Sequence, residues 1–235
     1  MLKLTINGSE IQAPEERTVL EVCREHGVHI PTLCYHPALE PYGACRLCMV
    51  EISSPPHPSR LVAACVHPCE DGAVIETDSE AVRKSRRATI ELLLAGAHND
   101  PALLALAEEY DVKEIRFKLP EEDLCVLCGL CVRACREIVG VSAISLINRG
   151  MARQVSTPFQ IASSTCISCG TCVLICPTGA IKLKDITHFH SVHHEDSEHE
   201  RVYCQICSTV DLSPVAIQNV DAQLETKIDH EVKQK

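Results

Sequence analysis

The chain has 235 residues, a formal net charge of −10 and 46% hydrophobic residues, which is enough apolar material for one large domain or a few small ones. The negative charge argues against a nucleic-acid-binding zinc protein, which usually presents a basic face. Sixteen residues are cysteines and tryptophan is absent. No signal-peptide pattern or membrane-length apolar run occurs, so we expect a cytoplasmic protein whose cysteines bind metal rather than form disulfides.

The N-terminal part carries the signals of a small mixed sheet with one helix. Alternating segments flank Asn7-Gly8, which predicts a hairpin because such a turn needs positive φ at both central residues. A helix follows, with Thr18 and Glu21 as a capping box and Gly27 at its end. Further short strands are expected at residues 47–53, 61–66 and 72–78.

A cysteine-free stretch with two predicted helices separates the cysteine groups. Ser79 is the expected N-cap of a helix that reaches about Ala97. Asp100-Pro101 then predicts a new helix, with Asp as the cap and Pro at the first helical position. Residues 114–120 are expected to form a short strand or an extended segment.

Two groups of four cysteines share the spacing C-x2-C-x2-C-x3-C, and two short strands are expected around Arg149-Gly150 between them. In this spacing three thiolates wrap one cubane and the fourth ligates the other cluster. One predicted [4Fe–4S] cluster therefore uses Cys125, Cys128, Cys131 and Cys176. The other uses Cys166, Cys169, Cys172 and Cys135.

Features around these groups refine the expectation. Gly129 and Gly170 should let backbone amides approach the cluster sulfurs. Arg136 stands where a proline is expected after the first group, and its charge is a candidate for raising the potential of the nearest cluster. Zinc is the alternative, but a zinc site needs four ligands, usually in two separated pairs, and fits two runs of four poorly.

A third group of four cysteines precedes the predicted helices. Its spacing is C-x10-C-x2-C-x16-C, which has a longer first loop than the plant-type ferredoxin pattern. Four thiolates on a loop and a strand end predict a [2Fe–2S] cluster, with zinc again the alternative. The ligands are Cys34, Cys45, Cys48 and Cys65.

Four cysteines lie outside these groups. Cys23 is expected to be a small buried hydrophobe, and Cys69 a bystander of the [2Fe–2S] site with an alternative role in a ligand swap. Cys204 and Cys207 follow a histidine-rich, aperiodic segment after Asp185. The pair is open to three interpretations: a zinc site completed by two of the nearby histidines, part of a further cluster at a subunit interface, or plain thiols. Those histidines are His188, His190, His193, His194 and His199.

The segments "GACRLCMVEI", "NRGMARQV" and "SSTCISCGTCVLICPTGAI" resemble the large peripheral iron–sulfur subunit of respiratory complex I. They are also similar to the iron–sulfur diaphorase subunit of NAD-linked [NiFe] hydrogenases and to the N-terminal region of [FeFe] hydrogenases. The resemblance covers residues 1–185 and implies an α+β protein. Its expected parts are a β-grasp [2Fe–2S] domain at 1–78, a helical connector at 79–119, a two-[4Fe–4S] ferredoxin-like domain at 120–185 and a His-rich segment with a CxxC at 186–235.

The chain departs from these relatives in the connector. The relatives carry a motif of one histidine and three cysteines, H-x3-C-x2-C-x5-C, which binds a further [4Fe–4S] cluster. Here "LLLAGAH" reaches His98 and "LLALAEEYDV" follows, but the cysteine-bearing loop is absent and Pro101-Ala102 stand in its place. We therefore expect His98 to be a helix-end or surface histidine, and three clusters rather than four.

The expected function is electron transfer rather than catalysis. The chain has no G-x-G-x-x-G after a strand and no P-loop, so no catalytic residue is predicted. The resemblance implies partners: a flavin-bearing NAD(P)H oxidoreductase subunit and a hydrogenase, formate dehydrogenase or other reductase, in a hetero-oligomer without nucleic acid and with no membrane segment of its own. Two alternatives are the iron–sulfur subunit of a quinone-linked succinate dehydrogenase or fumarate reductase, and a structural or regulatory zinc protein.

Overall fold

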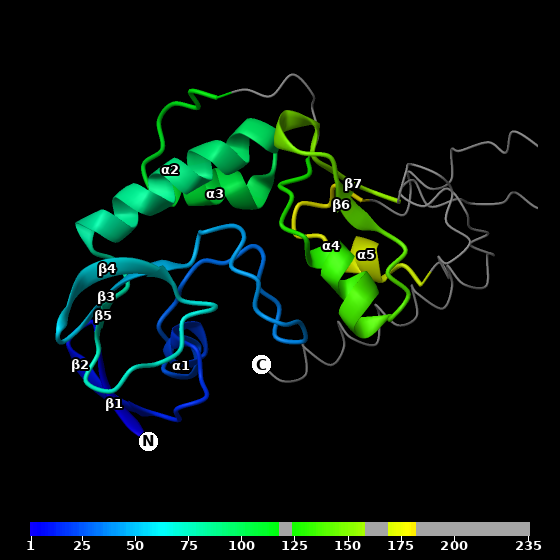
Figure 1. Cartoon of the computed structure of the whole chain (residues 1–235). Coiled ribbons are helices and arrows are strands. Elements are labelled where there is room, and N and C mark those ends of the chain that lie inside the picture. Colours follow the sequence, from blue (N-terminus) through cyan, green and yellow to red (C-terminus); the bar gives the residue numbers. More distant parts are fainter. Residues whose placement is uncertain (118–123, 158–168, 182–235) are drawn as a thin grey trace, which may run out of the picture. The chain divides into compact units, whose positions relative to one another are not determined.

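The computed structural model describes residues 1–117, 124–157 and 169–181 (Figure 1). The chain divides into two compact units, Met1–Cys128 and Gly129–Lys235. None of the helices in the described ranges combines the length and the apolar character that crossing a bilayer requires.

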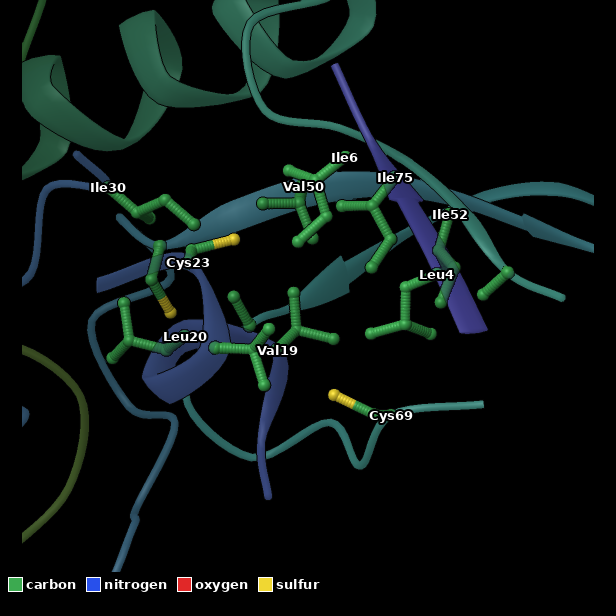
Figure 2. Close-up of a cluster of buried hydrophobic side chains, with 14 of the residues drawn as sticks. Leu4, Ile6, Val19, Leu20, Cys23, Ile30, Val50, Ile52, Cys69 and Ile75 are labelled. Carbon is green, nitrogen blue, oxygen red and sulfur yellow. The ribbon is translucent and has the colours of Figure 1, made fainter. Parts of the chain in front are cut away.

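The first unit is built on a mixed five-stranded sheet, with the strand order β2-β1-β5-β3-β4. β1 runs parallel to β5, and the other neighbouring strands are antiparallel. The helix α1 (Val19–Glu25) packs on the sheet, which gives the β-grasp arrangement that the resemblance implied (Figures 1 and 2). The strands are β1 (Leu2–Ile6), β2 (Ser9–Ala13), β3 (Met49–Ser54), β4 (His57–Ala63) and β5 (Val74–Glu76).

The predicted turn and helix cap are both present. Asn7 and Gly8 have φ angles of 48° and 81° and join β1 to β2, which confirms the hairpin. The Thr18 hydroxyl accepts a hydrogen bond from the Glu21 amide at 3.4 Å, and a Glu21 carboxylate oxygen accepts one from the Thr18 amide at 2.9 Å. This reciprocal pair satisfies backbone donors that the first helical turn leaves free.

The core of the β-grasp unit lies between α1 and the sheet. Leu20 and Cys23 of α1 are fully buried and lie in one cluster with Ile6, Val50 and Ile75 from three strands (Figure 2). Alternating apolar residues on the strands contact the apolar face of the helix, so the apolar surfaces of both are removed from water. The burial of Cys23 agrees with its expected role as a small hydrophobe.

Two helices follow the sheet and pack against each other, α2 (Glu80–Gly96) and α3 (Pro101–Glu109). Both predicted caps are present. The Ser79 side chain accepts a hydrogen bond from the Val82 amide, and the Asp100 carboxylate accepts one from the Leu103 amide at 2.9 Å. Residues 114–117, part of a predicted strand or extended segment, form no strand, and 118–120 lie outside the described residues.

One strand begins earlier than the sequence indicates. The expected strand at 61–66 is β4, which begins at His57 and ends at Ala63. Pro58 lies inside β4, and a proline within a run normally argues against a strand. β4 is the edge strand next to β3, so its outer side needs no ladder hydrogen bond and tolerates the proline.

The second unit contains short elements. β6 and β7 form an antiparallel hairpin around Arg149-Gly150, as predicted. α4 contacts both α5 and the π-helical η1, and α5 also contacts η1. The elements are α4 (Leu130–Arg133), η1 (Ala134–Ile138), β6 (Ser145–Ile147), η2 (Gly150–Ala152), β7 (Gln154–Ser156) and α5 (Thr171–Leu174).

Candidate metal centres

Four cysteine side chains converge beside the β-grasp sheet. Cys34 and Cys45 come from the loop before β3, Cys48 immediately precedes β3, and Cys65 follows β4. The Cys34 thiol is hydrogen-bonded to the thiols of Cys45 and Cys65, and Cys65 is also hydrogen-bonded to Cys48. Three of them, Cys34, Cys48 and Cys65, are each only 1% exposed. The structure therefore brings together the four residues predicted for the [2Fe–2S] site.

Backbone amides point at these sulfurs. The Cys45 N–H donates to the Cys34 sulfur at 3.4 Å, and the Ala44 amide donates to the same sulfur. The Leu47 amide donates to the Cys45 sulfur, and the Cys65 amide donates to the Cys48 sulfur. Such donors stabilise sulfur that carries negative charge and tune the redox potential of a bound cluster.

The four thiols cannot all ionise without a compensating cation. Hydrogen bonds with the thiols of Cys45 and then Cys65 lower the pKa of Cys34 to about 2. The same contact with Cys34 raises the pKa of Cys45 and of Cys65, since only one partner of each pair can give up its proton easily. A positively charged iron pair removes this conflict, so the chemistry of the donor set fits a cluster.

No three His, Cys, Asp or Glu side chains in the described parts of the chain surround a position for a single metal ion. The cysteines make pairwise thiol contacts instead: Cys34 with Cys45, Cys34 with Cys65, and Cys48 with Cys65. The assignment therefore rests on a set of four thiols, three buried and Cys45 half-buried, with backbone amide donors.

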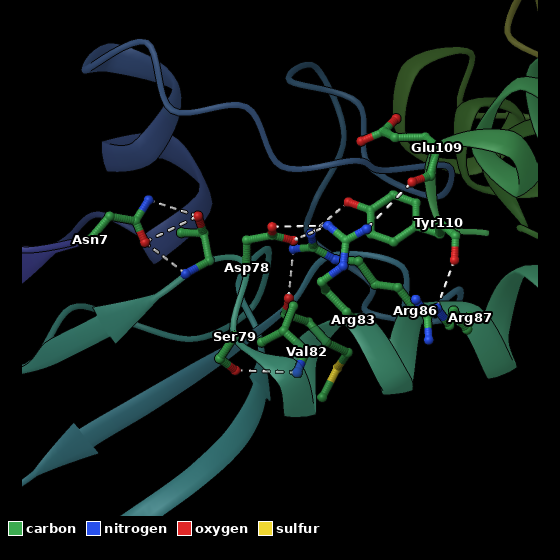
Figure 3. A network of polar contacts seen from close by, with 11 residues as sticks. Asn7, Asp78, Ser79, Val82, Arg83, Arg86, Arg87, Glu109 and Tyr110 are labelled. Carbon is green, nitrogen blue, oxygen red and sulfur yellow. Dashed lines mark hydrogen bonds and ion pairs between the residues drawn. The ribbon is translucent and has the colours of Figure 1, made fainter.

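A buried arginine lies behind this loop and was not predicted from the sequence. Arg86 of α2 is 2% exposed, and its guanidinium donates to the carbonyl oxygens of Leu47 at 3.2 Å and Met49 at 2.8 Å. It also donates to the Tyr110 hydroxyl at 2.8 Å (Figure 3). The two carbonyls belong to the residues on either side of Cys48. The spacing in the sequence could have indicated its burial, because Arg86 lies four residues after buried Val82 and four before buried Ile90, on the same helix face.

In the second unit, each of the two ferredoxin-type motifs contributes a short helix, α4 or α5. Gly129 precedes α4 with φ 74° and Gly170 precedes α5 with φ 70°. Both glycines therefore have a left-handed conformation that other residues adopt reluctantly, which is the observed reason for glycine at these two positions. Cys131, Cys135 and Cys172 share one apolar cluster, so residues from both motifs are brought together.

Sulfur contacts in this unit come from the backbone and from hydroxyls. The Ala143 amide donates to the Cys135 sulfur at 3.3 Å. Thr171 Oγ1 lies 3.3 Å from the Cys169 sulfur, and Thr178 Oγ1 lies 3.7 Å from the Cys176 sulfur. No sequence pattern singled out the two threonines. The Arg136 guanidinium is exposed and forms an ion pair with Glu137 at 2.7 Å.

The remaining predicted residues are divided between the described and the undescribed parts of the chain. Cys166, Cys204 and Cys207 lie outside the described residues, as do the five histidines between 188 and 199. His98 lies in the turn between α2 and α3, where its ring nitrogen is 3.0 Å from the Asn99 amide nitrogen. Cys69 is buried in the core with Cys65, and its amide donates to the Arg17 carbonyl oxygen.

Two family models match separate parts of the chain. Residues 1–80 match the 2Fe-2S iron-sulfur cluster binding domain, and residues 124–180 match the 4Fe-4S dicluster domain. The chain is an iron–sulfur protein. It has one domain for a two-iron cluster and one for two four-iron clusters.

Relatives of this iron–sulfur protein are subunits of redox complexes. The chain is 35% identical over 205 residues to NADPH-Fe(3+) oxidoreductase subunit alpha of Geobacter sulfurreducens, a match that covers 77% of this chain and 24% of the relative. It is 32% identical over 208 residues to an NADH-quinone oxidoreductase subunit of Rickettsia typhi, covering 78% and 30%. The chain thus spans at most about a third of the length of these relatives.

A solved structure is also similar. A chain of an NAD⁺-reducing [NiFe]-hydrogenase in the H2-reduced state matches with a TM-score of 0.64 and 29% sequence identity. The match covers 76% of this iron–sulfur protein and 85% of that chain. The resemblance that the cysteine motifs indicated is therefore confirmed in both sequence and fold.

Proposed function

We propose that this chain passes electrons between a flavin-bearing NAD(P)H-oxidising subunit and a second redox enzyme, within a hetero-oligomer. The observation that carries the proposal is the set of four thiols beside the sheet, three buried and one half-buried, with backbone N–H donors around them. Bound iron–sulfur clusters would supply one-electron transfer without a substrate pocket. The relatives named as NAD(P)H-linked subunits support the identity of the donor side.

The ligand assignment is part of the proposal. Cys34, Cys45, Cys48 and Cys65 hold the [2Fe–2S] cluster. The [4Fe–4S] clusters are held by the ferredoxin-type sets, in which the fourth cysteine of each motif serves the other cluster. These sets are Cys125, Cys128, Cys131 and Cys176, and Cys166, Cys169, Cys172 and Cys135.

The residues of the chain have three tasks in this function. The thiolates hold the clusters, the backbone amides of residues such as Cys45 and Leu47 stabilise the charged sulfurs, and burial limits the access of water. No residue of the chain is assigned to hydride or proton chemistry, which falls to the partner subunits.

Reduction in the presence and absence of a partner tests the proposal. We expect the anaerobically purified chain to remain oxidised when NADH or NADPH is added alone. The cluster EPR signals should appear once the copurifying flavoprotein is restored. Reduction of the clusters by NAD(P)H without any flavoprotein would contradict the assignment of NAD(P)H oxidation to a partner subunit. A stoichiometric [3Fe–4S] signal in the oxidised protein supports the quinone-linked dehydrogenase alternative instead.

A further inference from the structure

Arg86 carries a charge that the surrounding protein does not balance. Its side chain is among the largest that are fully buried, and within the described parts of the chain its hydrogen bonds go only to two backbone carbonyls and a tyrosine hydroxyl. None of the ion pairs formed by the described residues includes Arg86. Burying a charge without a nearby opposite charge costs free energy, so we expect an anion close to the Arg86 guanidinium.

Other buried residues on the same face of α2 have apolar side chains that serve packing alone. Val82, Ile90 and Leu94 are buried on the same face, each with an apolar side chain. A leucine or methionine at position 86 would continue this stripe without any cost of burying charge. The guanidinium therefore requires a reason that packing alone does not supply.

Arg86 contacts the backbone on both sides of Cys48, a proposed cluster ligand. Its Nε donates to the carbonyl oxygen of the Leu47–Cys48 peptide at 3.2 Å. The nitrogen of that same peptide is the backbone amide of Cys48. A hydrogen bond at the carbonyl end of a peptide polarises it and strengthens its N–H as a donor. The Met49 carbonyl, held at 2.8 Å, fixes the other side of Cys48.

We propose that Arg86 is the buried counter-charge of the [2Fe–2S] cluster and positions its ligand Cys48 through the Leu47–Cys48 peptide. The inference rests on the proposed two-iron site. A cluster held by four thiolates is anionic, and reduction adds one more negative charge. A fixed cation behind the ligand loop stabilises the reduced form more than the oxidised form, and so raises the midpoint potential of the cluster.

Neighbouring residues provide matched controls (Figure 3). Arg83 lies one turn earlier on α2 and also approaches the Tyr110 ring, at 5.3 Å against 5.6 Å for Arg86. Its charge, however, is paired with Asp78 at 3.0 Å, and its other hydrogen bond goes to the Glu109 carbonyl oxygen. Tyr110→Phe removes one hydrogen-bond acceptor of Arg86 and leaves its charge and its two carbonyl contacts.

The test is an EPR-monitored redox titration of the [2Fe–2S] signal in the full chain. For Arg86→Gln we expect the midpoint potential to fall by about 59 mV, which is a tenfold change in the one-electron reduction equilibrium. Arg86→Lys keeps the charge and should shift the potential less. Arg83→Gln and Tyr110→Phe should leave it at the wild-type value. An unchanged potential in loaded Arg86→Gln overturns the inference, as does an equal fall in Arg86→Lys.

Failure to assemble the cluster is also informative. If Arg86→Gln holds no two-iron cluster while Arg86→Lys holds one, the counter-charge is supported. If neither holds one while Arg83→Gln does, Arg86 acts as a packing residue and the inference is wrong. Absence of a two-iron signal in the wild-type protein contradicts the proposed function itself, and this inference with it.

Discussion

The backbone amide of Cys45 donates a hydrogen bond to the sulfur of Cys34 at 3.4 Å, eleven residues away in sequence. This contact closes the loop before β3 so that both thiols face the same site as Cys48 and Cys65. The loop is thus folded around its sulfurs by its own backbone, and the donors stabilise negative charge on them. The long spacing between Cys34 and Cys45 is compatible with a four-thiolate site for this reason.

Replacing one proposed ligand should remove one cluster and leave the others. We expect Cys48→Ala to lose the visible and EPR signals of the [2Fe–2S] cluster, with a loss of about two irons per chain. The matched control is Cys69→Ala, since Cys69 is buried in the same core but has no thiol contact with the set. Retention of the two-iron signal in Cys48→Ala and its loss in Cys69→Ala would assign Cys69 as the ligand.

Cys23 should be chemically inert in the folded protein. It is fully buried, and this burial, with a smaller effect of Cys69, raises the pKa of Cys23 to about 11. Because the thiolate is the reactive form, the neutral thiol at pH 8 should escape iodoacetamide. Mass spectrometry of alkylated peptides checks this, with the denatured protein as the control. Labelling of native Cys23 at the rate of the denatured chain contradicts the buried position.

The segment after α3 is held to α2 by one carboxylate. Arg116 donates to Glu91 from its backbone amide at 2.9 Å and from its side chain at 2.6 Å. We expect Glu91→Gln to speed hydrogen exchange in residues 112–117, measured by mass spectrometry. Asp111→Asn removes only an exposed pair with Lys113 and serves as the control. Equal exchange in Glu91→Gln and wild type contradicts this role.

The same contact has a defined pH dependence. Hydrogen bonds from the Arg116 side chain and amide lower the pKa of Glu91 to about 2, below the usual range of a glutamate. A carboxyl whose pKa falls on folding stabilises the fold above its unfolded pKa and loses that effect as pH falls toward the folded value. The protection of residues 112–117, corrected for intrinsic exchange, should therefore be constant between pH 6 and 8. A rise of local opening within that range argues for another titrating group.

The cap of α3 should stabilise the turn between α2 and α3. The Asp100 side chain is buried and accepts a hydrogen bond from the Leu103 amide at 2.9 Å. Asp100→Ala should destabilise α3 by about 1 kcal/mol, which corresponds to roughly fivefold faster exchange of its amides. Asp100→Asn keeps a capping oxygen and should exchange almost as slowly as wild type. Identical rates in all three proteins would show that the cap is not important here.

Local signals made most of the β-grasp unit predictable. Asn7-Gly8, the Thr18–Glu21 pair and the two later caps each act through backbone geometry within a few residues, so their sequence pattern is sufficient. Cysteine spacing likewise identified the four thiols of the first site. The early start of β4 could not be predicted, because tolerance of Pro58 depends on β4 being the edge strand.

The contacts that surround the sulfurs depend on tertiary structure. Arg86 reaches Leu47 across 39 residues, and the Ala143 amide reaches Cys135 only because the chain turns back after η1. Thr171 and Thr178 each follow a cysteine by two residues, a spacing that carries no signal of its own. An arginine on a helix is normally expected at the surface, so only its position within an apolar stripe distinguishes Arg86.

The metal content of the anaerobically purified chain tests the central claim most directly. One two-iron and two four-iron clusters predict about ten irons and a matching amount of acid-labile sulfide per chain, with zinc well below one equivalent. About fourteen irons would indicate a further four-iron cluster and contradict the proposed total of three clusters. A colourless protein with zinc and little iron would contradict the account of this chain as an electron carrier.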